Sequence, residues 1–271
     1  VDPAAKVVHE RPRFHRRDPA VVAGVGRQPS VEAHGPLGDH PGPARRDEFA
    51  KRGREPPGLR RAEPRIDRDL AVRLGEEAVA ISKLGRYEGP SGLVYISAGV
   101  KASVQATVHY TADHPHPSPA KGTHKTSYEV TNETTLSAHR RHQAKGHNVV
   151  SLNFAAATNP GGGFLTGARA QEEYLCRSSA LYLTIKDSPM YAYHRREGHK
   201  RYSDAMIYSP DVPVFRDDEH RLLPSPYHAS FITSAAPLTK HLHPEELSLV
   251  ADILRTRIWK ILTVAQAHGH D

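Results

Sequence analysis

A chain of 271 residues is long enough to bury a sizeable core, as one large α/β domain or two small ones, so its size does not exclude an enzyme. No run approaches the roughly 18 apolar residues of a membrane-spanning helix, and a single cysteine excludes an internal disulfide and a cysteine-based zinc site. The formal charge of +7 suits a polyanionic partner or substrate without identifying one.

The first segment, residues 1–64, is rich in Arg, Pro, Gly, Ala and His and contains no Ile, Tyr, Trp or Met. Such a composition cannot bury enough apolar surface to offset the entropy cost of ordering, so we expect the segment to be disordered. Its arginine pairs would suit a basic arm that binds a polyanion. An unselected extension explains the same composition equally well.

From residue 65 onward the pattern is that of a folded α/β domain. A helix ending at Gly85, a residue type that commonly follows a helix C-terminus, is predicted first. Its apolar stripe consists of Ile66, Leu70, Leu74, Ala78 and Ile81. Residues 93–96 are apolar and bracketed by glycines, which predicts a strand, and the proline- and histidine-rich residues 114–125 predict a surface loop.

Further along, residues 128–131 predict a strand, and Asn132 is expected to cap a helix that ends near Gly146. The apolar residues 148–155 predict a buried central strand, and a helix is expected over residues 171–186. Three more strands are predicted over residues 205–209, 212–215 and 230–235, separated by Pro210, Pro213 and a turn at Pro224, Ser225 and Pro226. A last helix opens at Pro244, reaches Gly269 and carries the stripe Leu247, Val250, Leu254, Ile258 and Ile261.

The most informative segment runs from Asn159 to Glu173. Three consecutive glycines, 161–163, leave backbone amides unshielded by any Cβ, so a diphosphate could approach to hydrogen-bonding distance. A Gln-Glu-Glu triplet then opens a helix, where the helix dipole lowers a carboxyl pKa, so a glutamate could act as an acid only if burial opposed that effect. Each feature alone is typical of ordinary turns and helix starts. Together, after a buried strand, they indicate a site for chemistry.

Gly-Gly-Gly, a spacer and Gln-Glu-Glu resemble the signature of poly(ADP-ribose) glycohydrolases, and the surrounding LNFAAATNPGGGF resembles their bacterial branch. The similarity extends to residues 85–87, 175–177, 181–182 and 208–218 and covers the chain from about Ile66 onward. The resemblance implies a three-layer α/β/α macrodomain with a mixed central sheet over residues 65–271. It also implies a glycosidase that hydrolyses the ribose–ribose O-glycosidic bonds of poly(ADP-ribose) and releases ADP-ribose.

Carried over residue by residue, the resemblance implies that Glu173 protonates the leaving ribose oxygen and that Glu172 holds ribose hydroxyls in place. The other residues implied in substrate binding are Gly161, Gly162 and Gly163 for phosphate, Gln171 for orienting the carboxylates, and Asn159 and Asn153 for ribose. Adjacent helical residues point about 100° apart, so one acid and one positioning residue is a more plausible division than two carboxylates flanking the bond. No metal and no cofactor is expected.

Other candidate residues have simpler interpretations. The pairs His114/His116 and His139/His142 are expected to be surface histidines, because no carboxylates complete a metal site around them. Cys176 is expected to be a packed small residue. Tyr182, Tyr208 and Phe231 could stack on adenine, although such aromatic residues more often belong to a core.

Several expectations concern the protein as a whole. Poly(ADP-ribose) or ADP-ribosylated proteins are the expected substrates. The protein is expected to act in the cytoplasm, as part of the DNA damage response. It is expected to be a monomer that does not bind membranes or nucleic acid directly. The bacterial relatives continue past the last helix with a strand and a second phosphate loop, so a C-terminally truncated domain is expected. An ADP-ribose-binding module without turnover and a nonfunctional gene product stay open as alternatives.

Overall fold

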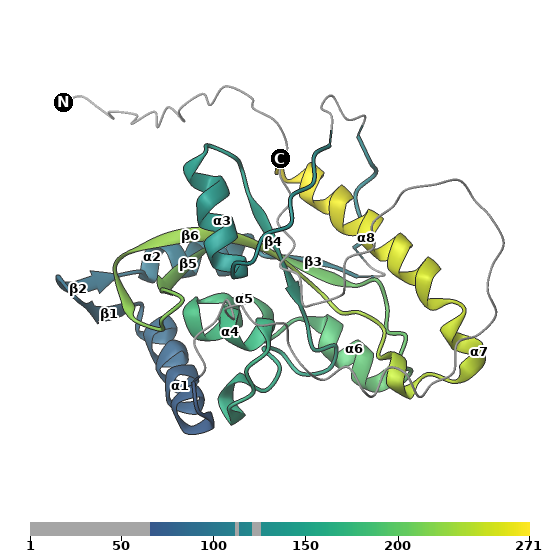
Figure 1. The fold of residues 1–271 in the computed structure, drawn as a ribbon, viewed down its shortest axis with the longest axis horizontal. Helices are drawn as coiled ribbons and strands as arrows, with labels where there is room; N and C mark the ends of the chain where they lie inside the picture. Colours follow the sequence, from purple (N-terminus) through teal and green to yellow (C-terminus); the bar gives the residue numbers. More distant parts are fainter. Residues whose placement is uncertain (1–65, 112–113, 121–125) are drawn as a thin grey trace, which may run out of the picture.

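The computed structural model describes residues 66–111, 114–120 and 126–271. The expected disorder of residues 1–64 lies outside this part of the chain. The described residues form a mixed α/β domain (Figure 1). Its helices are α1 (Arg68–Leu84), α2 (Ser97–Ala106), α3 (Thr135–Ala144), α4 (Gln171–Ser178), α5 (Leu181–Ile185), α6 (Pro189–Glu197), α7 (Pro244–Leu247) and α8 (Val250–Ala267), with 3-10 turns η2 (Phe164–Thr166) and η3 (Thr239–His241). Its strands are β1 (Arg86–Gly89), β2 (Gly92–Tyr95), β3 (Val108–Tyr110), β4 (Val150–Phe154), β5 (Met206–Arg216) and β6 (Leu222–Ser234).

The main sheet has four strands in the order β3-β5-β6-β4, and β1 and β2 form a separate hairpin. β4 runs parallel to β6, whereas β3 and β5 are antiparallel to their neighbours, so the sheet is mixed as expected. Within the described residues β4 pairs only with β6. The prediction that β4 is a central strand is therefore wrong for this part of the chain: it is buried because helices cover it.

The sheet separates two apolar clusters, which gives the expected three layers. Side chains alternate along a strand, so Ile207 faces one side of β5 and Met206 and Tyr208 face the other. The side of Ile207 packs against α1, α2, α4, α5 and α6, and the side of Met206 packs against α8. Figure 1 shows α8 on the side of the sheet opposite to α1, α4 and α6. No helix in the described ranges has both the length and the apolar character needed to cross a bilayer.

The first predicted helix is confirmed as α1. Leu74, Ala78 and Ile81 are buried, and Gly85 follows in the left-handed conformation with φ of +68°. An alanine Cβ at Gly85 would lie 2.5 Å from the Cβ of Ser97, so the tight connection into the β1–β2 hairpin requires glycine.

Four prolines that were expected to separate strands lie inside them. β5 is one strand of 11 residues, and its pairing with β6 is irregular between Ser209 and Val212, on either side of Pro210. β6 begins at Leu222 and includes Pro224 and Pro226, where the register shifts again. Proline has no N–H for the ladder, so it is tolerated at such irregularities. Pro213 pairs regularly with His228, so the interruption predicted there is wrong, and the other two are irregularities within strands rather than strand ends.

Two predicted helices are each divided in two. The helix expected over residues 171–186 breaks at Ser179, which is extended and forms an isolated bridge with Val214 of β5. The last helix divides into α7 and α8, and its predicted stripe is partly exposed: Leu247 and Ile258 are open to solvent. Val264 and Ala265 bury the α8 face instead.

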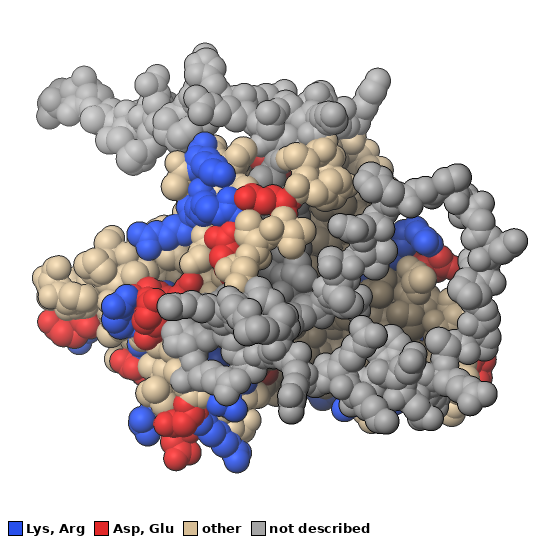
Figure 2. Space-filling model, in the orientation of Figure 1, with Lys and Arg blue, Asp and Glu red and all other residues tan. Residues whose placement is uncertain are grey.

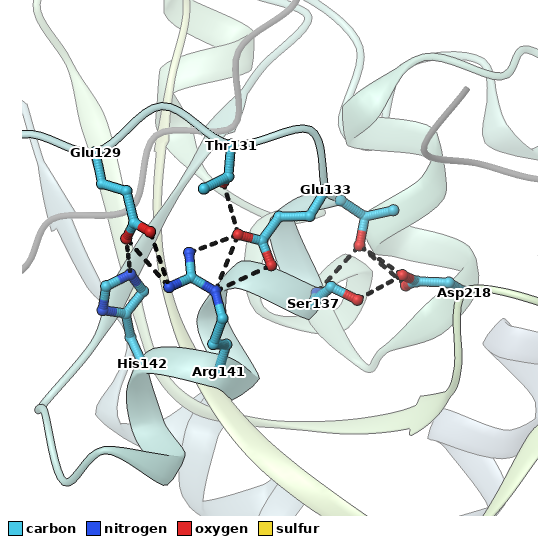
Figure 3. Close-up of polar contacts among 8 residues, drawn as sticks. Glu129, Thr131, Glu133, Ser137, Arg141, His142 and Asp218 are labelled. Carbon is cyan, nitrogen blue, oxygen red and sulfur yellow. Dashed lines mark hydrogen bonds and ion pairs between the residues drawn. The ribbon is translucent and has the colours of Figure 1, made fainter. Parts of the chain in front are cut away.

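The segment before α3 is not the predicted strand. Residues 128–131 have no regular structure, and Thr134, not Asn132, caps α3 by accepting a hydrogen bond from the Ser137 N–H. The guanidinium of Arg141 pairs with Glu129 and Glu133 and so holds the segment against α3 (Figure 3). Figure 2 shows the resulting mixture of basic and acidic side chains over α3.

A carboxylate just beyond β5 also holds the start of α3. Asp218, just beyond β5, accepts hydrogen bonds from Ser137 of α3 (Figure 3), from Thr134, which caps that helix, and from Tyr174 of α4. These contacts join segments that lie far apart in the sequence, so no local sequence pattern predicts them.

Four elements of the described residues were not predicted from the sequence: β1, α2, β3 and α6.

Candidate functional site

The site lies at the carboxyl end of β4, where the chain turns through residues 155–163 and enters η2 and α4. Gly161 and Gly162 adopt left-handed conformations with φ of +72° and +58°. A Cβ on Gly162 would lie 2.2 Å from Glu173 Oε1 and 3.2 Å from Glu172 Oε2. The glycines therefore let the loop pack directly against both carboxylates, which a larger residue would prevent.

Glu172 is almost fully buried, at 3% exposure. Its Oε2 accepts a hydrogen bond of 2.7 Å from the Ala156 N–H, and its Oε1 lies 3.4 Å from Nδ2 of buried Asn153. Burial raises the pKa of Glu172 to about 7, with the neighbouring charge of Glu173 acting in the same direction and the hydrogen bonds opposing it. The two adjacent carboxyl groups can therefore hold one proton between them near neutral pH.

Glu173 joins the glycine loop to the first turn of α4. Its Oε1 accepts from the Gly163 N–H at 2.9 Å, and its Oε2 accepts from the Ala170 N–H at 3.0 Å. The side chain is buried, at 8% exposure. Glu172 and Glu173 thus point to different backbone donors, as expected for adjacent residues of a helix.

Gln171 does not contact the carboxylates, in contrast to the expectation that it orients them. Its Nε2 donates to the Leu152 carbonyl at 2.7 Å, and its Oε1 accepts from the Phe154 N–H at 2.9 Å. The amide has both a donor and an acceptor, so it matches the exposed edge of β4. Gln171 fixes α4 to β4 and acts on the carboxylates only through that junction.

The glycine amides are also arranged differently from the expectation of free phosphate donors. The Gly162 N–H donates to the Asn159 carbonyl at 3.0 Å, and the Gly163 N–H is taken by Glu173. Asn159 Nδ2 donates to the Gly162 carbonyl, which closes the loop on itself. A phosphate can still approach closely here, but the amides of Gly162 and Gly163 would first have to leave their present acceptors.

Asn153 and Asn159 therefore play different parts in the structure. Asn153 is fully buried and bridges Glu172 to Thr233 of β6, with its amide 3.1 Å from Thr233 Oγ1. Asn159 is exposed at the turn. The structure brings all the predicted site residues together around one loop, although only Asn153 among the polar ones contacts a carboxylate.

The remaining candidates lie away from this loop or beneath it. Cys176 is buried, as predicted. Tyr182 packs on Phe164, with ring centroids 4.9 Å apart, and Tyr208 stacks on His268. Phe231 is fully buried in the core. Within the described ranges, no group of three or more His, Cys, Asp or Glu side chains could hold a metal ion.

The prediction that His139 is a surface histidine is wrong. The ring is only 1% exposed, and Nδ1 lies 2.9 Å from Ser151 Oγ of β4. Burial lowers the pKa of His139 to about 4, with the nearby His270 and His142 contributing. The polar pattern around it in α3 gave no indication that this one residue turns inward.

Sequence reasoning also missed two contributions to the site. The Ala156 N–H is a backbone donor, so no side-chain pattern reveals it. His194 and Arg195 of α6 hold the carbonyls of Ala157 and Thr158. The only sequence signal for them is a basic run in a segment that was not predicted to be helical.

Comparison with known proteins is consistent with this geometry. The family model described as microbial-type PARG, catalytic domain, matches residues 75–217, which is more than half of the chain. A crystal structure of poly(ADP-ribose) glycohydrolase from Thermomonospora curvata is similar at 43% identity and a TM-score of 0.70, covering 75% of this chain and 77% of that one. No match is found among curated proteins.

Two ligand-bound structures are also similar. The Thermomonospora curvata enzyme bound to the inhibitor ADP-HPD matches at 42% identity with a TM-score of 0.68, over 75% of this chain and 77% of that one. The Deinococcus radiodurans enzyme in complex with ADP-ribose matches at 40% identity with a TM-score of 0.57, over 64% of this chain and 72% of that one. The chain therefore belongs to the family of microbial-type poly(ADP-ribose) glycohydrolase catalytic domains.

Proposed function

We propose that this chain hydrolyses the ribose–ribose O-glycosidic bonds of poly(ADP-ribose), releasing ADP-ribose, with Glu173 as the general acid. The observation that carries the proposal is the buried pair of carboxylates at the start of α4, packed against a glycine loop. Family membership supplies the class of enzyme, a glycosidase. The similar Deinococcus radiodurans structure holds ADP-ribose, which supports this nucleotide as the product.

The pair can supply one proton near neutral pH. Burial and mutual repulsion disfavour two negative charges side by side, and the raised pKa of Glu172 reflects this. The proton passes to the leaving ribose oxygen as the glycosidic bond breaks, and the negative charge left behind stabilises the oxocarbenium-like state. Water then adds to the anomeric carbon, and its proton returns to the carboxylate.

Glu173 is the proposed donor, while Glu172 is held by Ala156 and Asn153 and positions ribose hydroxyls. The Glu173→Gln variant is expected to lose about 10²- to 10⁴-fold in kcat, the usual contribution of a general acid. Labelled polymer and chromatography of the products measure it. Glu76→Gln on exposed α1 is the matched control and should retain full activity.

Glutamine cannot accept both backbone hydrogen bonds of Glu173, so thermal unfolding and calorimetric binding of ADP-ribose must accompany the rates. A folded Glu173→Gln variant that binds ADP-ribose and still hydrolyses polymer at the parent rate would refute the assignment. A larger loss in Glu172→Gln would transfer the acid role to Glu172, whose pKa already favours it.

An ADP-ribose-binding module without turnover is the second candidate. It is favoured by Glu173, because both oxygens of the side chain that would have to donate the proton accept hydrogen bonds from backbone N–H groups. Calorimetry that shows ADP-ribose binding by the parent chain, without release of ADP-ribose from polymer, would select this function.

The proposal extends to the setting in which the enzyme acts: a monomer in the cytoplasm that removes polymer formed in the DNA damage response. Its support is the substrate class alone. Sedimentation of the purified chain tests the monomer, and cell fractionation tests the location.

A further inference from the structure

We propose that His194 of α6 is a positioning residue that sets the Ala156 N–H against Glu172 by holding the Ala157 carbonyl. The inference rests on the proposed function, because it concerns the same carboxylate. His194 lies outside the glycine loop and α4, and neither the family match nor the proposed acid assigns it a role.

The loop after β4 is held at successive residues. The Ala155 N–H donates to the Ser234 carbonyl at 3.1 Å, and the Ala156 N–H donates to Glu172 at 2.7 Å. The next carbonyl, of Ala157, lies 2.9 Å from Nδ1 of His194, and the Thr158 carbonyl accepts from Arg195 at 2.6 Å. His194 and Arg195, adjacent in α6, thus fix the two carbonyls that follow the amide facing Glu172. We call these two hydrogen bonds the clamp.

The contacts of His194 select a single form of the ring. The Ala157 carbonyl can only accept, so Nδ1 must carry a proton. The backbone N–H of Ser203 donates to Nε2 at 3.0 Å, so Nε2 must be bare. The neutral Nδ1–H tautomer alone satisfies both, and the ring is 1% exposed. A second proton, on Nε2, would face the Ser203 N–H, so this contact disfavours the charged ring.

The surroundings of His194 favour the neutral form. Burial lowers the pKa of His194, the hydrogen bond to the Ala157 carbonyl opposes this, and the charges of Arg257 from α8 and His199 from the following loop act with burial. Tyr193 and Tyr202 place their rings beside it. Around Glu172, the titratable neighbours are Glu173, Cys176 and Tyr191, and Asn153 is the neutral hydrogen-bond donor.

Loss of the clamp has a directed consequence. The hydrogen bond from Ala156 lowers the pKa of Glu172, in opposition to burial. If the loop moves and that bond lengthens, the pKa of Glu172 rises further. A loss of general stability alone would not produce this shift.

Two variants of similar size separate these effects. His194→Asn places an amide donor where Nδ1 lies and keeps the bond to Ala157, whereas His194→Gln places its amide where Nε2 lies and loses that bond. We expect His194→Gln to lower kcat by about 10- to 100-fold and to move the alkaline limb of the pH profile upward. His194→Asn should retain the parent profile.

The decisive readout does not depend on activity. Titration of ¹³C-labelled glutamate carboxyls by NMR, with Glu172→Gln used for assignment, gives the pKa of Glu172 in each folded variant. An upward shift in His194→Gln but not in His194→Asn supports the proposal. Equal values in both variants overturn it, even if polymer hydrolysis itself turns out to be absent.

Arg195 provides a second test that leaves the core intact. Arg195→Ala removes the bond to the Thr158 carbonyl from an exposed side chain, and the neighbouring exposed Arg196→Ala is the matched control. We expect Arg195→Ala to raise the pKa of Glu172 in the same NMR titration and Arg196→Ala to leave it unchanged. If His194→Gln fails to fold and Arg195→Ala gives no shift, the clamp proposal is wrong.

Discussion

Gly162 is the residue at which the site leaves no space. Its φ of +58° lies in the left-handed region, and any Cβ would meet Glu173 Oε1 at 2.2 Å. The second carboxylate, Glu172, would be 3.2 Å away. Both carboxylates therefore pack closely around the α-carbon of Gly162, and their positions depend on the absence of a side chain at this residue.

Substitution of this glycine is expected to affect chemistry beyond its effect on stability. Gly162→Ala should lower kcat by 10²-fold or more, because the Glu173 carboxylate must move. Gly146→Ala is the matched control, since Gly146 also has a positive φ, +86°, but nothing lies within 4 Å of its Cβ. It should cost about 1–2 kcal/mol of unfolding free energy and leave kcat unchanged. Equal kinetics for the two folded variants would contradict the steric argument.

The residues of the site were predictable to the extent that they are local in sequence. The glycines and both glutamates lie between residues 159 and 173, so a strand, a turn and a helix were enough to bring them together. Ala156 and His194 were not predictable in this way. One acts through its backbone, and the other comes from α6, 37 residues after the carbonyl that it holds.

At the scale of elements, the sequence indicated type and order better than extent. α1 and β4 have clear periodicity and were found close to their predicted positions. Pro210, Pro224 and Pro226 were interpreted as strand ends, although β5 and β6 absorb them as irregularities because their partners continue to pair. At Ser179, in contrast, pairing with a distant segment ends an element. Ser179 forms a bridge with Val214 of β5, and α4 therefore ends before it.

The contact between α3 and β4 should make stability depend on pH. The pKa of His139 is about 4 when folded and 6.5 in the reference state, so the unfolded chain binds the proton first. The contribution of His139 to the free energy of unfolding is therefore fully present above pH 6.5 and is lost as the pH falls toward 4. It amounts to about 3 kcal/mol.

Urea unfolding of the parent and of His139→Asn between pH 8 and pH 4 measures this contribution. The variant keeps a hydrogen-bonding atom near Ser151 but carries no titratable ring. It should be less stable at pH 8 and should lose less stability on acidification than the parent. Parallel curves for the two proteins would show that His139 is not buried in its neutral form.

At the scale of the whole molecule, the fold places the carboxylates of Glu172 and Glu173 at the end of a sheet that helices cover on both faces. α1, α2, α4, α5 and α6 cover one face and α8 the other, and the site lies where β4 ends and α4 begins (Figure 1). Ligands of α/β sheets characteristically bind outside the carboxyl ends of strands. The three-layer fold was predictable from the family resemblance, whereas the edge position of β4 depends on pairing between distant segments.

The central claim is that this buried pair supplies a catalytic proton near neutral pH, and the pH dependence of kcat for polymer hydrolysis tests it most directly. The pKa of Glu172 is about 7, so kcat should fall as the pH rises through about 7, because the pair loses its proton. In Glu172→Gln that transition should disappear or move to another pH. A parent profile that stays flat from pH 6 to pH 9, or a transition that survives unchanged in Glu172→Gln, would contradict the account.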